Sequence, residues 1–347
     1  MSEREYAPEW LEVCPPPLPS SQKHWIIAHG QQFEAQLGYR PQLHSPLSRT
    51  LEEWGSLLND ISARFSLPQA ETTSIRSVDM EIAPEKIPIR IYFPEDTHVQ
   101  RNVPLAVYVH GGGWAMGDLD TEDFQPRTIA KEARMVVVSV DYRLAPGHPF
   151  PDGLNDCVRG ISWTSSNSTK LGATTQEVIV IGGSAGANLV IASALKIIDQ
   201  GQKSILKGVA ALVPVTVHPD AVPLKFRNRY RSYDEEADCP IDTADAMRDR
   251  GGFWDAYTNE ISSYTSVLLH PRLHEMPPTY IAVAEKDVLR DDGLLLKHVL
   301  EEYGVPVKCD SYGGLPHYFW SFPGPSLANK AREFQENLLK GLEFVNG

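Results

Sequence analysis

The stretch Val178-Ile-Val-Ile-Gly-Gly-Ser-Ala-Gly-Ala-Asn-Leu-Val190 decides how the rest of the chain is interpreted. Its β-branched run, residues 178–181, is typical of a buried strand, and the pattern from 187 to 198 is typical of a helix. Between them stands Ser184, with one glycine two positions before it and another two positions after it. Such a turn needs small neighbours, because strand and helix pass close to the serine. Strand, tight turn and helix in this order indicate a nucleophile elbow, whose helix N-terminus favours developing negative charge.

Strands and helices alternate on both sides of this stretch. Strands are predicted at 74–83, 87–93, 103–109, 135–140, 178–181, 208–213, 279–284 and 305–311, the first two as an antiparallel hairpin at a sheet edge. Helices are predicted at 123–133, 151–165, 187–199, 289–303 and 326–344. This alternation predicts an α/β fold, with a mostly parallel sheet that is covered by helices on both faces.

Two parts of the chain do not follow the alternation. Residues 1–75 contain predicted helices at 23–37 and 47–64 but no convincing strand, and residues 214–276 form an insertion too long for an ordinary connection. We expect both to be cap segments over a core made of 76–213 and 277–347, at the sheet edge where α/β proteins bind ligands. The alternative for the N-terminal part is a packing arm that has no role at a site.

Composition narrows the class of protein. The 347 residues are 42% hydrophobic, enough for a substantial core, and carry a formal net charge of −13. Nucleic acids and anionic membrane surfaces attract basic patches, so neither is expected as a partner. The four cysteines are far apart and form no CxxC pair, which argues against a metal site and a disulfide framework. Without signal-peptide features or a membrane-length apolar run, the protein is expected to be soluble and cytoplasmic.

A run of glycines follows the strand predicted at 103–109. In His110-Gly-Gly-Gly-Trp114, successive backbone N–H groups are free to point at a ligand, as an oxyanion hole requires. Taken in isolation, such a run is more often a flexible turn. Upstream of a Gly-x-Ser-x-Gly turn, its position matches the oxyanion loop of lipases and esterases, with the N–H of Ala185 as a further donor.

A serine hydroxyl needs a base to remove its proton. Among eleven histidines we favour His317, because it follows the last predicted strand in a loop before the final helix. His270 and His274, in the inserted segment, are the alternatives, and His110 is expected to hold the glycine loop in place.

The base in turn needs a carboxylate that fixes its tautomer. Asp287 follows the strand at 279–284 and should therefore lie at the same sheet edge as Ser184. Its alternative role is that of a helix N-cap. Glu285, Asp291 and Asp292 are the other candidates, the last two more typical of solvated charges on a helix face. The order serine, aspartate, histidine is that of an α/β-hydrolase.

Five segments together resemble the hormone-sensitive-lipase-like group of α/β-hydrolase esterases. They are His110-Gly-Gly-Gly-Trp114, Asp141-Tyr-Arg-Leu-Ala-Pro146, Gly182-Gly-Ser-Ala-Gly-Ala-Asn188, Asp287-Val-Leu-Arg-Asp-Asp-Gly293 and Gly314-Leu-Pro-His317. The matches span roughly residues 75 to 345. The chain departs from the group at Gly183, where Asp or Glu is usual, at Ala187, where Gly is commoner, and at Val288, where Pro is usual.

The resemblance implies an eight-stranded core sheet, a helical cap, and a triad of Ser184, His317 and Asp287. It further implies oxyanion donors at Gly111, Gly112 and Ala185, and a structural role for the Asp141-Tyr-Arg motif. Catalysis would need no metal or organic cofactor.

We therefore expect a serine carboxylesterase that acts on short- to medium-acyl esters of small molecules, with Trp114 and aromatic residues of the inserted segment lining its site. Transfer of the acyl group to another acceptor, elimination with the same triad, and a non-catalytic ligand-binding protein are the alternatives. A homodimer is left open.

Overall fold

The computed structural model describes residues 38–65, 74–94, 103–323 and 327–347, and its centre is an eight-stranded sheet. The strands are β2 Arg76–Ile82, β3 Ile87–Phe93, β4 Leu105–Val109, β5 Val136–Val140, β6 Val178–Gly183, β7 Leu206–Leu212, β9 Thr279–Lys286 and β10 Val307–Pro316. Their order is β10-β9-β7-β6-β4-β5-β3-β2, and only the β2–β3 and β3–β5 pairs are antiparallel. The predicted α/β fold, its eight strands and its edge hairpin are confirmed.

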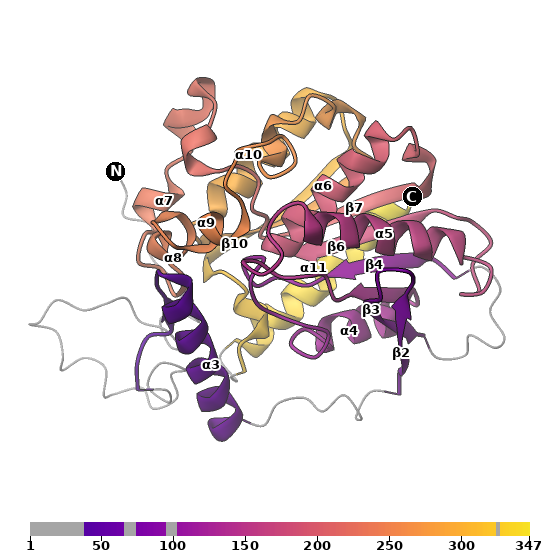
Figure 1. The fold of residues 1–347 in the computed structure, drawn as a ribbon, viewed down its shortest axis with the longest axis horizontal. Helices are drawn as coiled ribbons and strands as arrows, with labels where there is room; N and C mark the ends of the chain where they lie inside the picture. Colours follow the sequence, from indigo (N-terminus) through magenta and orange to yellow (C-terminus); the bar gives the residue numbers. More distant parts are fainter. Residues whose placement is uncertain (1–37, 66–73, 95–102, 324–326) are drawn as a thin grey trace, which may run out of the picture.

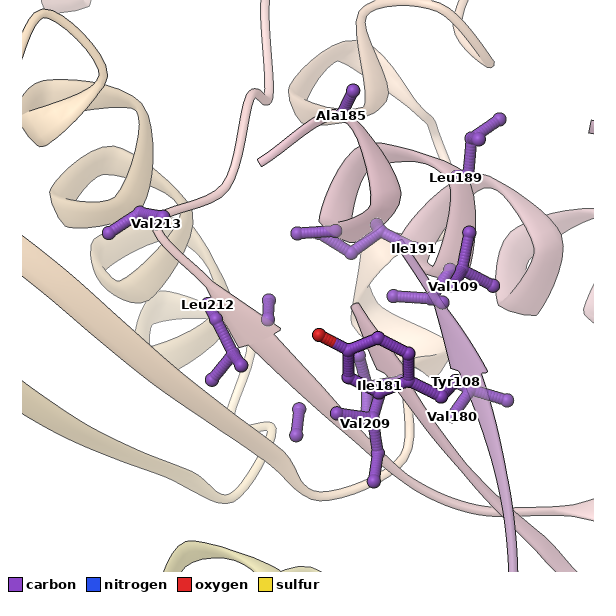
Figure 2. Close-up of a cluster of buried hydrophobic side chains, with 14 of the residues drawn as sticks. Tyr108, Val109, Val180, Ile181, Ala185, Leu189, Ile191, Val209, Leu212 and Val213 are labelled. Atoms are coloured by element: carbon purple, nitrogen blue, oxygen red, sulfur yellow. The ribbon is translucent and has the colours of Figure 1, made fainter. Parts of the chain in front are cut away.

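The central strands are continuous apolar runs because both of their faces are covered. Every residue of β4, β5 and β6 is buried. Figure 2 shows Val109 of β4 on the side of Leu189 of the following helix, and Ile181 of β6 beside Tyr108 of β4 on the other face of the sheet. This packing makes the sheet a rigid base for the loops at its edge.

Five long helices cover the sheet, close to the predicted ranges. They are α4 Phe124–Glu132, α5 Asp152–Ser166, α6 Ala185–Asp199, α10 Arg290–Glu302 and α11 Ala328–Asn346. The helices α5, α6 and α10 lie on one face of the sheet, and α4 and α11 on the other (Figure 1). Hydrogen bonds between Gln125 of α4 and Gln335 of α11 join the two helices of the second face.

The N-terminal and inserted segments lie together on one side of the molecule. There α3 Leu47–Arg64 begins beside the segment between the short helices α8 Ala244–Arg248 and α9 Phe253–Tyr257, and α7 Ser232–Glu235 lies on the same side of the molecule (Figure 1). A parallel two-stranded sheet joins the segments, β1 Gln42–Leu43 with β8 Ile241–Asp242. The sequence of the insertion predicts no strand, because a two-residue strand leaves no pattern. The helix predicted at 23–37 lies outside the described residues.

The inserted segment is tied to the core by two carboxylates of α10. Asp292 is fully buried and accepts hydrogen bonds from the backbone N–H of Thr216 at 2.7 Å and from the Tyr230 hydroxyl at 2.8 Å. Asp291 accepts from the N–H groups of Arg231 and Ser232. The prediction that both aspartates are solvated is wrong. They satisfy backbone donors of the insertion that would otherwise be buried without a partner.

Asp292 should make the stability of the protein depend on pH. Burial raises the pKa of Asp292 to about 7, although hydrogen bonds from Thr216, Tyr230 and Val217 act to lower it. The folded state therefore binds this proton more tightly than the unfolded state, so the contribution of Asp292 to stability falls as the pH rises from about 4 to about 7.

We expect the difference in unfolding free energy between wild type and Asp292→Asn to fall across this range and to level off above it. Denaturant unfolding at several pH values measures the difference. Asp234→Asn, whose side chain is 87% exposed, is the control. Parallel pH curves for wild type and Asp292→Asn would contradict the expectation.

Candidate active site

Ser184 lies at the turn between β6 and α6, in a backbone conformation that the neighbouring glycines make accessible. Its φ is 53° and its ψ is −121°. A Cβ on Gly182 would lie 2.4 Å from the carbonyl oxygen of Gly186, and a Cβ on Gly186 would lie 2.2 Å from that of Val109. No side chain fits at either position. The positive φ of Ser184 is a strained conformation for a residue other than glycine, and such strain is characteristic of functional sites.

The sheet register brings the glycine loop and the serine turn together. Val109 pairs with Gly182 across β4 and β6, so the loop that follows β4 begins beside the turn that holds Ser184. The N–H of Ser184 donates to the carbonyl of Leu212 on β7 at 2.8 Å, which fixes the turn from the other side.

The register also pairs the predicted base with its acid. Pro316 of β10 lies opposite Lys286 of β9, so the next residues, His317 and Asp287, are neighbours. The Nδ1 of His317 is 2.6 Å from Asp287 Oδ2. The other carboxylate oxygen of Asp287 accepts from the N–H of Leu289 at 2.8 Å. Asp287 thus contacts the imidazole and also fixes the turn before α10, whose N-cap residue is Leu289 and not Asp287.

A second carboxylate lies against the other nitrogen of His317. Asp242 Oδ2 is 3.3 Å from His317 Nε2, and both side chains are nearly inaccessible to solvent. Burial acts to lower the pKa of His317, but the charges of Asp287 and Asp242 outweigh it and raise the pKa to about 9. The two carboxylates therefore favour the imidazolium form of His317. No hydrogen bond joins the Ser184 hydroxyl to a residue in the described part of the chain.

The other candidates from the sequence lie elsewhere. His270 pairs with Asp199 at the far end of α6 from Ser184, and His274 contacts Glu275. Glu285 accepts from the N–H of Gly314. His110 stacks on Tyr142, whose hydroxyl donates to the carbonyl of His110 at 3.2 Å, so this pair supports the glycine loop.

Gly111, the first glycine of the loop that follows β4, does not fit the role of oxyanion donor predicted for it. The N–H of Gly111 donates to Glu122 Oε1 at 2.8 Å and is thereby unavailable to an oxyanion. The expectation that Gly111 is an oxyanion donor is corrected on this ground. Gly112 and Gly113 have φ values of 105° and 57°. Their N–H groups donate to no residue in the described ranges, and neither does that of Ala185 at the start of α6.

Glu122 is a residue of the site that the sequence does not predict. Besides Gly111, this carboxylate accepts hydrogen bonds from the hydroxyls of Tyr318, at 3.1 Å, and Tyr108. It therefore connects the glycine loop with the residue that follows His317. The Asp-Thr-Glu-Asp run at 120–123 contains several carboxylates, and nothing in the sequence distinguished this one.

The same contacts explain the unusual glycine before the serine. A Cβ on Gly183 would lie 1.9 Å from the hydroxyl oxygen of Tyr318, and one on Gly111 would lie 2.5 Å from it. Tyr318 thus occupies the space into which an acidic side chain at 183 would project. Glu122, held by this tyrosine, places a carboxylate beside the turn instead.

Gly183→Ala should therefore damage the site in a way that depends on Tyr318. We expect a clear loss of kcat/KM toward an ester, because the half-buried ring of Tyr318 must shift to admit the methyl group. The same change in a Tyr318→Ala background should have a smaller effect. A double-mutant cycle measures this coupling, and additive effects would contradict it.

A cavity of about 890 Å³ opens over Ser184. Its apolar wall comes largely from the N-terminal segment and from the region after β10, and its polar wall includes Gly112, Gly113, Glu122, Asp242 and His317. The apolar lining includes Leu43, Trp54, Leu58, Ile61, Met116, Phe124, Ile241, Trp320 and Phe322. The site is thus a largely apolar pocket with convergent polar groups, the usual form of a small-molecule site.

Trp114 does not line this cavity, so its predicted substrate contact is wrong. Its ring stacks on Tyr257 of α9 at a centroid distance of 4.3 Å and lies 4.8 Å from Trp254. The side chain is 1% exposed. Trp114 therefore fastens the glycine loop to α9 of the inserted segment. Of that segment, Ile241 and Asp242 reach the cavity, whereas its aromatic residues do not.

The sheet, the covering helices and the serine turn define the alpha/beta hydrolase fold. A sequence model of this fold matches residues 106–321. In the described ranges, no helix is long and apolar enough to cross a membrane.

Comparison with known proteins identifies the family within this fold to which the chain belongs. Versiconal hemiacetal acetate esterase of Aspergillus parasiticus is 37% identical over 91% of this chain and 97% of its own length. A protein of Aspergillus terreus named FAD-linked oxidoreductase pytB is 44% identical over 82% of this chain, which spans only 34% of that protein. The crystal structure of EstE1, a thermostable carboxylesterase cloned from a metagenomic library, superposes with a TM-score of 0.72 at 27% identity, over 87% of this chain and 98% of EstE1. The chain belongs to the hormone-sensitive-lipase-like carboxylesterase family of alpha/beta hydrolases.

Proposed function

We propose that the chain is a serine carboxylesterase that hydrolyses short- to medium-acyl esters of small molecules through an acyl-enzyme intermediate. The observation that carries the proposal is the pairing of His317 with buried Asp287 at the rim of a cavity that also exposes Ser184. Family membership supports the same reaction class.

Each residue has a distinct part in the proposed reaction. Ser184 Oγ attacks the ester carbonyl carbon while its proton passes to His317 Nε2, and Asp287 holds the imidazole and balances the charge that forms. His317 then returns the proton to the leaving alcohol as the carbon–oxygen bond breaks. Water attacks the acyl-enzyme in a second round with the same base.

The developing oxyanion needs N–H donors that are free of other partners. We propose Gly112, Gly113 and Ala185 for this part. All three belong to the loop or turn beside Ser184, and the occupied N–H of Gly111 is left out.

We further propose that residues 1–75 and 214–276 act as a cap over a core of 76–213 and 277–347. The pairing of β1 with β8 supports this division. So does the cavity lining, because Trp54, Leu58 and Ile61 of the N-terminal segment contribute to it. A packing arm without a role at the site would not supply a cavity wall.

Labelling with a fluorophosphonate tests the catalytic proposal. We expect a single covalent adduct, located by mass spectrometry at Ser184. A folded protein that gives no adduct would instead be a ligand-binding protein.

Turnover of p-nitrophenyl esters from acetyl to decanoyl would then define the acyl length. Incorporation of labelled oxygen from water into the released acid would show that water is the acyl acceptor. Cytoplasmic location and a homodimer stay predictions.

A further inference from the structure

The carboxylate of Asp242 has an unusual position for a residue outside the predicted triad. It is 3.3 Å from His317 Nε2, the nitrogen that must accept the proton of Ser184 in the proposed reaction. Asp242 is 6% exposed, and its carboxylate oxygens accept no hydrogen bond from another residue in the described ranges. A buried carboxylate is costly unless it is paired, so His317 is the group that stabilises it.

The backbone around Asp242 is held in a strained form that aims it at the histidine. The preceding residue, Ile241, has a φ of 72°, which is a strong outlier for a β-branched side chain. Three contacts hold the strand in place. The N–H of Ile241 donates to Pro41, the Cys239 thiol donates to the carbonyl of Asp242, and the Thr243 hydroxyl donates to Leu43. Strain that is held from several sides points to a functional position.

We propose that Asp242 is a positioning residue for ester hydrolysis, a second carboxylate partner of His317 that stabilises the imidazolium from the side of Nε2 and is delivered there by the paired segments β1 and β8. The proposal rests on the proposed function, because it assigns the proton-accepting role to His317.

The charged groups around this pair agree with the assignment. His317 faces Asp287 from the end of β9, Asp242 from β8 and, farther away, Glu122 from the segment before α4. All three favour its protonated form. Burial raises the pKa of Asp242 and the charge of Asp287 adds to this, whereas His317 opposes both. The nearby Tyr233 and Cys239 have pKa values well above their usual range because they are buried, so neither supplies a charge.

A second carboxylate beside His317 should change the reaction rate in opposite directions below and above the pKa of this histidine. Below the pKa of His317, Asp242 reduces the fraction of neutral base and slows the reaction. Above that pKa the base is already neutral, and Asp242 accelerates the reaction because it strengthens the base and stabilises the imidazolium formed in the transition state.

Removing the charge of Asp242 should therefore make the pH–rate profiles of wild type and variant cross. For Asp242→Asn we expect the inflection of kcat/KM to move from about 9 to lower pH by about one pH unit or more. Activity near neutral pH should rise severalfold, and the limiting activity at high pH should fall. The measurements are kcat/KM for a neutral p-nitrophenyl ester and the rate of Ser184 phosphonylation, each from pH 6 to pH 10.

A structural role alone would lower activity at every pH and would not move the inflection. Asp238→Asn, which removes a charge from an exposed side chain of the same segment, should leave the inflection in place. Asp242→Ser serves as a second neutral variant if the first does not fold, and the two must agree. If the wild-type protein formed no phosphonate adduct at Ser184, the proposed function itself would be refuted. An adduct at Ser184 with an unmoved inflection in the neutral variants would refute the role of Asp242 alone.

Discussion

Ser184→Ala is expected to lower kcat for an ester substrate on the order of a million-fold, the loss that follows removal of the nucleophile from a serine protease. The remaining activity would come from the oxyanion donors and the cavity. The fold should be unaffected, because the Ser184 hydroxyl makes no hydrogen bond to a residue in the described ranges and alanine adopts the same backbone angles no less readily. Steady-state kinetics, thermal unfolding and phosphonate labelling together measure these outcomes.

Ser193→Ala provides a matched control for that experiment. Ser193 is a fully buried serine of the same helix, more than two turns from the elbow. Its loss should leave kcat and labelling within a few-fold of wild type. If the Ser184 variant kept its turnover while remaining folded, the nucleophile would have to be another residue.

Asp287→Asn is expected to lower kcat on the order of ten-thousand-fold. An amide in place of the carboxylate can donate to Nδ1, which favours the tautomer with its proton on Nε2, the wrong nitrogen for a base. It also removes the largest of the three carboxylate charges that raise the pKa of His317. The surviving activity should therefore be half-maximal at lower pH than in wild type.

Glu285→Gln is the comparison for this variant, because Glu285 precedes Asp287 by two residues and contacts the N–H of Gly314 rather than the base. Its effect on kcat should be small, and a pH–rate profile of both variants separates the two roles. Equal losses at 285 and 287 would mean that the loop needs both charges for its shape, and that Asp287 has no special relation to His317.

The sheet could be predicted because its central strands are buried on both faces, which requires unbroken β-branched runs such as Val136–Val140. The pairing of His317 with Asp287, and a common cavity for His317 and Ser184, could be predicted as well. Each of these residues follows a strand of one parallel sheet, and the carboxyl ends of such strands meet at one edge.

The surroundings of these three residues could not be predicted. Glu122 and Asp242 act through contacts with residues more than ten positions away, and no local pattern marks them. Trp114 is the reverse case, a residue that was predicted to contact the substrate but does not line the cavity. Its position beside the glycines suggested a place at the substrate, but the aromatic rings of α9 form a more complete packing site for it. A two-residue strand such as β8 is likewise created by its partner and not by its own sequence.

The pairing of β1 with β8 has a consequence for protein engineering. Residues that are some 200 positions apart form one wall of the cavity, so a graft that exchanges only one of the two segments would set the side chains of one relative against those of another in that wall. Altering substrate range by exchange between relatives should therefore succeed only when both pieces come from the same donor. The sheet that carries the serine, the histidine and their acid can stay untouched.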